Sequence, residues 1–206
     1  KVEIACHNIR DYTLDKHNRV DDAPYGGGMG MVMAAQPIND CLEAVIKDYD
    51  KKPRVIYLSP KGKTFDQKKA IELSKLDGFV LLCGHYEGVD ERVLEKCVDE
   101  EISLGDFVLT GGEIAAVAVA DAVCRLLPGV LSDDICFSEE SHWSGLLEYP
   151  QYTRPAVWHG REIPEILTSG NHEKVRLWRR KQSLRRTKER RPDMYEKLDL
   201  TSKQDK

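Results

Sequence analysis

Apolar residues in the first part of the chain follow two periods, one typical of strands and one typical of helices. Val2, Ile4 and Cys6 alternate with polar residues, which predicts a strand. From Pro37 to Tyr49 the apolar positions recur every three or four residues, which predicts an amphipathic helix. Alternation of strand and helix along the chain indicates an α/β protein.

Two short apolar runs, RVIYLS at 54–59 and FVLLCG at 79–84, each predict a further strand. A helix capped by Asp66 or Thr64 is expected between them. Continuous apolar strands that are joined through a helix are typical of a parallel sheet covered on both faces. Ligands of such sheets bind beyond the carboxyl ends of the strands.

Three loops that contain glycine follow the predicted strands at that edge. Their sequences are LSPKG at 58–62, CGHYEGVD at 83–90 and SLGDFVLTGGE at 103–113. Glycine lets the backbone approach a ligand closely and adopt positive φ. We therefore expect the three loops to surround one small molecule with main-chain groups. None contains GxxxxGK[ST] or GxGxxG, and neither does a fourth glycine cluster, PYGGGMGM at 24–31.

The segment 114–127, IAAVAVADAVCRLL, is apolar almost all round and predicts a helix that is buried on most sides. In so small a domain such a helix indicates a homodimer interface. Arg125 falls in its last turn, where we expect it beside the molecule that the loops bind. Asp121, four residues earlier, lies on the same helix face, so an ion pair between the two is the purely structural alternative.

Composition narrows the class of protein. The 206 residues are 41% hydrophobic, enough for a real core, and no apolar run approaches the roughly 18 residues of a membrane span. We therefore expect a cytoplasmic protein without a membrane partner. The six cysteines form no CxxC pair, so neither a disulfide framework nor a zinc site is indicated.

Positive charge is concentrated near the end of the chain. The segment 174–191 holds ten Lys or Arg residues and one acid, Glu189, although the whole chain carries a net charge of −4. A basic block with an embedded Trp178 favours contact with a polyanion such as RNA or DNA. The alternative is a solvated helix face.

Seven motifs, spread in order along the chain, resemble those of the bacterial tRNA (guanine-N1)-methyltransferases, the TrmD family. They are DDAPYGGGMGM, YLSPKG, CGHYEGVDERV, SLGDFVLTGGE, RLLPGVL, GLLEYPQYTRP and SGNHEKVRLWRRKQSLRRT. Together they cover essentially the whole chain.

The resemblance implies a fold and an activity. The fold is a SPOUT-type α/β domain with a parallel sheet and a deep trefoil knot, over residues 1–131, followed by an acidic linker at 132–149 and a small, all-α, basic tRNA-binding domain at 150–206. The activity is transfer of the methyl group of S-adenosylmethionine to N1 of the guanine immediately 3′ of the tRNA anticodon. The family works as a homodimer whose active sites are shared between subunits.

The resemblance also assigns roles to residues of this chain. Arg125 would stabilise O6 of the guanine, and Arg154, Arg185 and Arg186 would contact the tRNA. The residues that would bind the cofactor lie in the three glycine loops or, for Tyr57, directly before the first of them: Tyr57, Leu58, Ser59, Pro60, Gly84, Tyr86, Glu87, Gly88, Leu104, Gly105, Asp106, Phe107, Val108, Leu109, Gly111 and Gly112.

Methylation at N1 needs a general base, because that nitrogen carries a weakly acidic proton at neutral pH. The resemblance places the family's aspartate at Glu140, in FSEESHW, where this chain has a glutamate. Glu139, or Asp133 and Asp134, are the alternatives. No metal-ligand spacing is present, and a Mg²⁺ ion is allowed by the resemblance alone.

Two other readings of the sequence are a metal-dependent nuclease that uses Asp21, Asp22, Asp90 and Glu91, and an RNA-binding module without catalysis. The family also has a strand and a helix ahead of VEIACHNIRDYT, which this chain does not contain, so we expect truncation at the amino end.

Overall fold

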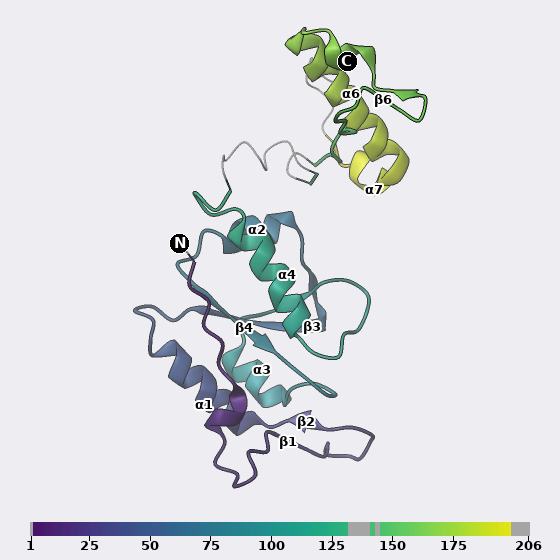
Figure 1. Cartoon of the computed structure of the whole chain (residues 1–206). Helices are drawn as coiled ribbons and strands as arrows, with labels where there is room; N and C mark the ends of the chain where they lie inside the picture. Colours follow the sequence, from purple (N-terminus) through teal and green to yellow (C-terminus); the bar gives the residue numbers. More distant parts are fainter. Residues whose placement is uncertain (1, 132–140, 143–144, 199–206) are drawn as a thin grey trace. The chain divides into compact units, whose positions relative to one another are not determined.

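The computed structural model describes residues 2–131, 141–142 and 145–198. The chain divides into two compact units, residues 1–131 and 132–206, which are treated separately below (Figure 1). No helix among the described residues is long and apolar enough to cross a membrane.

The first unit is built on a parallel sheet of three strands in the order β4-β3-β5. Strand β3 (Arg54–Thr64) lies in the middle and pairs with β4 (Phe79–Cys83) and β5 (Glu100–Ser103). The predicted parallel sheet is confirmed, and both apolar runs lie in strands. Each strand is followed by a helix, which reverses the chain so that the next strand can run in the same direction.

Helices cover both faces of this sheet (Figure 1). Helices α1 (Ala35–Ile46) and α3 (Glu91–Cys97) pack on one face, where Ile38, Leu42 and Val93 meet Val55 of β3. Helices α2 (Gln67–Leu73) and α4 (Glu113–Cys124) pack on the other face, where Leu73 and Val119 meet Ile56. Alternate residues of β3 therefore serve two separate cores.

The helix caps agree with the sequence. The side chain of Asp66 accepts a hydrogen bond from the amide of Lys69, so Asp66 rather than Thr64 caps α2. Asp90 caps α3 in the same way, through the amide of Arg92. Helix α1 begins at Ala35, two residues before the predicted Pro37.

Two predicted elements differ from the structure. Residues 2–7 form no strand, although Val2, Ile4 and Cys6 alternate, and all of them are exposed. Strand β3 does not end at Ser59: it continues to Thr64 after a shift in register between Leu58 and Lys63. Gly62 permits this continuation, since a Cβ there would lie 2.5 Å from the carbonyl carbon of Glu101.

Three short elements complete the amino-terminal unit. A 3₁₀ helix, η1 (Ile9–Tyr12), packs on α1, and strands β1 (Asp21–Asp22) and β2 (Val32–Met33) form an antiparallel pair. The glycine cluster at 24–31 connects β1 to β2.

The second unit is formed around a long helix, α6 (His172–Arg190), which the short helix α7 (Pro192–Tyr195) follows. A 3₁₀ helix, η2 (Glu165–Thr168), packs on α6. The prediction of an all-α domain omitted one hairpin, made by β6 (Val157–Trp158) and β7 (Arg161–Glu162). Thr187 of α6 is fully buried, where its hydroxyl accepts from the amide of Leu147 and donates to the carbonyl of Ser183.

Candidate functional site

Two of the three predicted glycine loops, at 83–90 and 103–113, come together in the first unit, whereas residues 58–62 lie within β3 and not in a loop. The amide of Gly112 donates to the carbonyl of Gly84 at 3.0 Å, and His85 forms a β-bridge with Gly111. The hydroxyl of Tyr57 lies below the same loop, since a Cβ on Gly84 would come within 2.8 Å of it. The loops that follow β4 and β5 are thus joined above Tyr57 of β3, as expected of neighbouring parallel strands.

Tyr57 forms the floor of this site. Its ring is buried in the core with Leu82 and Val89. Burial, reinforced by the nearby negative charges of Glu101 and Glu91, raises the pKa of the phenol. The side chain is therefore a neutral hydrogen-bonding group at physiological pH. Leu58 and Ser59, which follow it, are also buried, whereas Pro60 is exposed.

The loop at 84–88 is held by backbone hydrogen bonds to β2 and to the residue before it, a contact that no local pattern predicts. The amide of Met33 donates to the carbonyl of Gly88, and the amide of Glu87 donates to the carbonyl of Met31. Tyr86 has a positive φ of 58°, which a tyrosine adopts only where its surroundings impose it. Its exposed hydroxyl accepts from Arg10 at 3.1 Å.

The glycine cluster at 24–31 also borders this loop. The carboxylate of Glu87 lies against Gly30, where a Cβ would come within 3 Å of it. Because the two segments are more than fifty residues apart, no local pattern could have placed them together.

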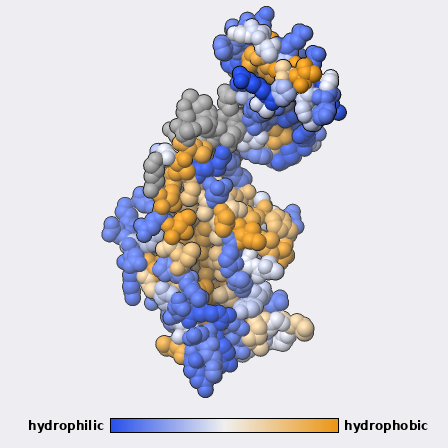
Figure 2. Space-filling model, viewed as in Figure 1, coloured by the Kyte–Doolittle hydropathy of each residue, from blue (hydrophilic) through white to orange (hydrophobic). Residues whose placement is uncertain are grey.

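The loop at 104–112 is fixed at its start and end and exposes its middle. The hydroxyl of Ser103 both donates to the carbonyl of Gly105 and accepts from its amide. Asp106, Phe107 and Val108 are exposed, as is Leu109, while Leu104 packs against the core. Figure 2 shows hydrophobic residues gathered over α4 and the loop that precedes it.

A second polar contact ties the two loops together. The ring nitrogen Nε2 of His85 lies 2.5 Å from a carboxylate oxygen of Glu113, the first residue of α4.

Burial, together with the charge of Glu113, raises the pKa of the Cys83 thiol to about 11, so this cysteine stays protonated and is a poor nucleophile.

Arg125 lies at the opposite end of α4 from the third glycine loop. It is the carboxyl-terminal cap of α4, whereas Gly112 is the amino-terminal cap. Twelve helical residues separate the two, which corresponds to roughly 18 Å at 1.5 Å per residue. Glu140, with its alternatives Glu139, Asp133 and Asp134, lies outside the described residues.

Two of the four acidic residues of the alternative nuclease prediction, Asp21 and Asp90, lie beside arginines. Asp90 caps α3 and accepts two hydrogen bonds from the guanidinium of Arg92, which lowers the pKa of its carboxyl group. Asp21 lies 3.9 Å from Arg10. Among the described residues, no group of three His, Cys, Asp or Glu side chains is placed to hold a metal ion.

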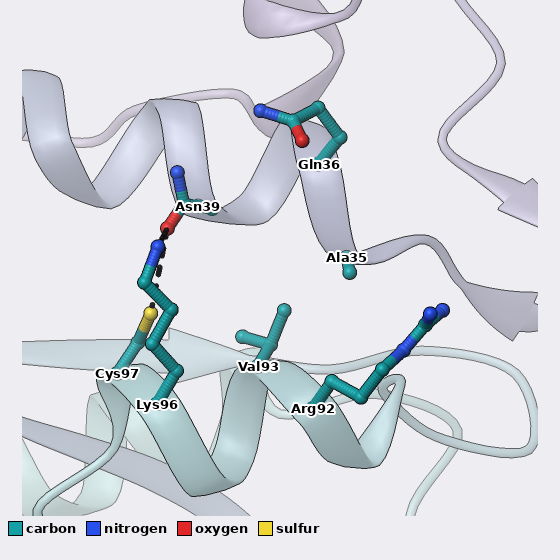
Figure 3. A pocket seen from close by; sticks show the side chains of 7 residues that line it. All are labelled: Ala35, Gln36, Asn39, Arg92, Val93, Lys96 and Cys97. Atoms are coloured by element: carbon teal, nitrogen blue, oxygen red, sulfur yellow. Dashed lines mark hydrogen bonds between the residues drawn. The ribbon is translucent and has the colours of Figure 1, made fainter.

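One cavity of the first unit lies away from the glycine loops (Figure 3). It measures about 480 Å³ and is open to solvent between α1 and α3. Lys96 projects across it and donates to Asn39 at 2.9 Å, and Arg92 lies at its other end. None of the residues predicted to bind cofactor lines it.

In the second unit, Arg154 and Arg185 are exposed and Arg186 is half-buried. Arg185 pairs with Glu189 at 2.8 Å, one turn further along α6. Cations that project from a helix suit the phosphates of a nucleic acid, and the exposed position of Arg185 allows its ion pair to be exchanged.

Fold and site together define an α/β protein in which two glycine loops are joined at the carboxyl edge of a parallel sheet. The family model described as tRNA (Guanine-1)-methyltransferase TrmD matches residues 1–197. The chain belongs to this family, which confirms the assignment made from the seven motifs.

Relatives agree with this assignment over nearly the whole chain. A protein of Alkaliphilus oremlandii named tRNA (guanine-N(1)-)-methyltransferase is 58% identical over 98% of this chain and 83% of its own length. Proteins with the same name from Clostridium perfringens and Ruminiclostridium cellulolyticum are 60% and 56% identical, over 99% and 96% of this chain and 85% and 84% of their own lengths.

Proposed function

We propose that this chain is an enzyme that transfers the methyl group of S-adenosylmethionine to N1 of the guanine immediately 3′ of the anticodon in tRNA. The observation that carries the proposal is the family match over residues 1–197, in a chain whose glycine loops after β4 and β5 meet at one edge of the sheet. The names of the relatives agree with it.

The loops fit the cofactor in two respects. Their backbones pack closely, because a Cβ on Gly84 or Gly112 would collide with Tyr57 or with the Cα of Cys83, so main-chain groups rather than side chains form the surface. Exposed apolar side chains, among them Tyr86 and Phe107, lie next to these main-chain groups and suit the adenine ring. When bound, S-adenosylmethionine supplies an electrophilic methyl group with its own leaving group.

The residues of this chain that would hold the cofactor are those of the three loops. They are Tyr57 to Pro60, Gly84, Tyr86, Glu87, Gly88, Leu104 to Leu109, Gly111 and Gly112. Of these, Leu58 and Leu104 would contribute through the backbone, because their side chains pack in the core. Such a site has mainly to position the methyl group of the cofactor against the acceptor nitrogen, since the cofactor already supplies an electrophilic methyl group and a leaving group.

The acceptor nitrogen needs two further groups. Glu140 would remove the N1 proton as general base, and the guanidinium of Arg125 would stabilise the negative charge that then develops on O6. Both assignments rest on the family resemblance. An additional Mg²⁺ ion has the same basis, and the cytoplasm is the compartment in which we expect the reaction.

The position of Arg125 favours a homodimer with shared sites. An arginine side chain cannot span the roughly 18 Å between the two ends of α4, so the loops of a single chain would lack their O6 donor. The outer face of α4 exposes Ile114 and Val117, at 64% and 69%. A second copy packed against this face in the opposite direction would cover these side chains and bring its Arg125 toward the loops.

A trefoil knot would explain the close contacts at Gly112. There the chain enters α4 with its backbone against Cys83 and Gly84, and a Cβ would lie 2.7 Å from the Cα of Cys83. This is the kind of contact expected where one segment passes through the loop formed by another. Knots are rare, so the proposal depends on the family rather than on general rules of topology.

The second unit would bind the tRNA through Arg154, Arg185, Arg186 and the other cations of α6. The excess positive charge of this helix favours a polyanion, and the family identifies that polyanion as tRNA. The domain borders proposed above, with a linker at 132–149 and a tRNA-binding domain from residue 150, rest on the same resemblance.

A calorimetric titration of the chain with S-adenosylhomocysteine tests the proposal. The transferase account predicts saturable binding, and Gly105→Val, which forces a β-branched residue into a φ of 153°, should abolish it. A metal-dependent nuclease or a purely RNA-binding module would leave the titration flat, and the proposal would then be wrong.

A further inference from the structure

A second cavity, of about 420 Å³, lies within the carboxyl-terminal unit. Residues 149–156 form one side, and Val175, Trp178 and Arg179 of α6 lie on the other. The ring centroids of Tyr152 and Trp178 are 6.4 Å apart at 51°, and the guanidinium of Arg179 lies 4.7 Å above the ring of Tyr149. Three aromatic rings and two guanidinium groups therefore line this cavity, together with aliphatic side chains such as Ile163 and Leu167.

This cavity is open to solvent rather than a closed part of the core. Tyr152 is 48% exposed, and Arg154 beside it is exposed as well. Trp178 is only half-buried. Aromatic side chains with their faces this accessible are what proteins use to hold unstacked bases of single-stranded RNA, and arginine planes assist them. The volume falls within the range of about 300–1,000 Å³ that is typical of small-molecule sites.

Charge around the cavity indicates which ligand suits it. Arg154 and Arg179 line it, and Arg185 lies seven residues beyond Trp178 on α6, roughly 10 Å along the helix. A base in the cavity would therefore have its own phosphate and its neighbours' within reach of cations. A neutral or acidic peptide would contact the same cations, but it would lack the planar base that stacks on the aromatic rings.

We propose that this cavity binds one unpaired nucleobase of the tRNA, different from the guanine that is methylated. The inference rests on the proposed function, because that function makes tRNA the nucleic acid and places the anticodon loop, with its unpaired bases, on the enzyme. Tyr152 and Trp178 provide the stacking surface, and Arg154 contacts the attached phosphate.

The test measures binding of the whole chain to a set of tRNA transcripts that each lack one base of the anticodon loop. Tyr152→Ala should weaken binding of the intact transcript roughly tenfold, which is within the usual effect of losing one base–aromatic stack. Tyr152→Phe should bind like the parent, since it keeps the ring. Trp158→Ala is the matched control, because Trp158 is an aromatic of the same unit, 62% exposed, that does not line the cavity.

One abasic transcript identifies the base that is bound. It should bind the parent about tenfold more weakly than the intact transcript does, and Tyr152→Ala should weaken it no further. Two results would overturn the inference. One is that Tyr152→Ala binds the intact transcript as tightly as the parent does. The other is that Tyr152→Ala further weakens the binding of every abasic transcript, because its effect would then be independent of each base. Methylation of the intact transcript by the parent is measured in the same samples. If the parent does not methylate the transcript, the proposed function is contradicted, whereas the binding data test only the inference about the cavity.

Discussion

The amide of Gly112 donates a hydrogen bond of 3.0 Å to the carbonyl of Gly84, which joins the start of α4 to the loop after β4. The two residues are 28 positions apart, and neither has room for a side chain: a Cβ on Gly112 would meet the backbone of Cys83, and a Cβ on Gly84 would meet the ring of Tyr57. This contact sets the relative position of the two loops that we assign to the cofactor.

Gly112→Ala should therefore both destabilise the chain and weaken cofactor binding. The added methyl group would lie 2.7 Å from the Cα of Cys83, and backbone cannot move aside as a side chain can. Overpacking of this kind costs about 1–3 kcal/mol. Thermal unfolding and a titration with S-adenosylhomocysteine would measure the two effects.

Gly111→Ala is the matched control for stability. Its methyl group would meet the ends of the side chains of Glu113 and His85, which can rotate away. Gly111→Ala should thus melt close to the parent. Equal losses in both variants would mean that close backbone packing at Gly112 is not the cause.

Mixed dimers test whether active sites are shared. Gly105→Val distorts a cofactor loop, and Arg125→Ala removes the O6 donor, so each homodimer should lose at least roughly 10²-fold in rate. If Arg125 serves the loops of the other subunit, mixing the two variants should restore about a quarter of the parental sites, since half of the dimers are mixed and half of their sites are intact. Methyl transfer per chain is the readout, and no recovery in verified mixed dimers would place Arg125 in its own chain's site.

The exposed arginines of α6 should control tRNA binding. Arg185→Ala combined with Arg186→Ala should weaken binding and reduce the slope of log affinity against log salt concentration by about one to two, because fewer counterions are released. Affinity for S-adenosylhomocysteine should not change. Lys16→Ala with Arg19→Ala removes two exposed cations from the other unit as a control, and an equal change in slope there would refute a specific role for α6.

Four charged residues link β3, α2 and β5 and should make stability depend on acid pH. Lys69 contacts Glu72 and Glu100 at 2.8 and 2.9 Å, and Arg54 contacts the same two carboxylates. Hydrogen bonds from Lys69, and then from Arg54, lower the pKa of Glu72 to about 2. Since the pKa in the unfolded chain is about 4.3, this pairing stabilises the fold above that pH and is lost as the pH falls toward 2.

Glu72→Gln should therefore lower the melting temperature at pH 7, and the difference from the parent should shrink between pH 4.3 and pH 2. High salt should reduce the difference as well. Glu95→Gln, an exposed glutamate of α3, is the control. A difference that stays constant across this pH range would show that the charge of Glu72 is not what stabilises the fold.

Local patterns in the sequence were enough to predict most of the first unit. The run at 79–83 became β4, and the two glycine loops after β4 and β5 met as expected because parallel strands end at one edge of the sheet. The continuation of β3 to Thr64 was missed because Pro60 and Gly62 favour a turn, whereas pairing with β5 keeps the backbone extended.

Contacts between distant segments were beyond such reasoning. The hydrogen bonds of Met33 to the loop at 84–88 leave no trace in the spacing of residues. Arg125 lies at the end of α4 opposite the third loop, and periodicity within one chain does not identify which segment faces it. The family resemblance, not periodicity, identified Glu140.

The most direct test of the account is to locate the methyl group on a tRNA transcript after incubation with the chain and S-adenosylmethionine. We expect 1-methylguanosine at the position immediately 3′ of the anticodon, and none in a transcript with adenosine there. Glu140→Gln should slow the single-turnover rate roughly 10²-fold or more, while Glu140→Asp and Glu139→Gln keep much of it. A methyl group at another position or atom, or an intact chain that binds both substrates and transfers nothing, would contradict the account.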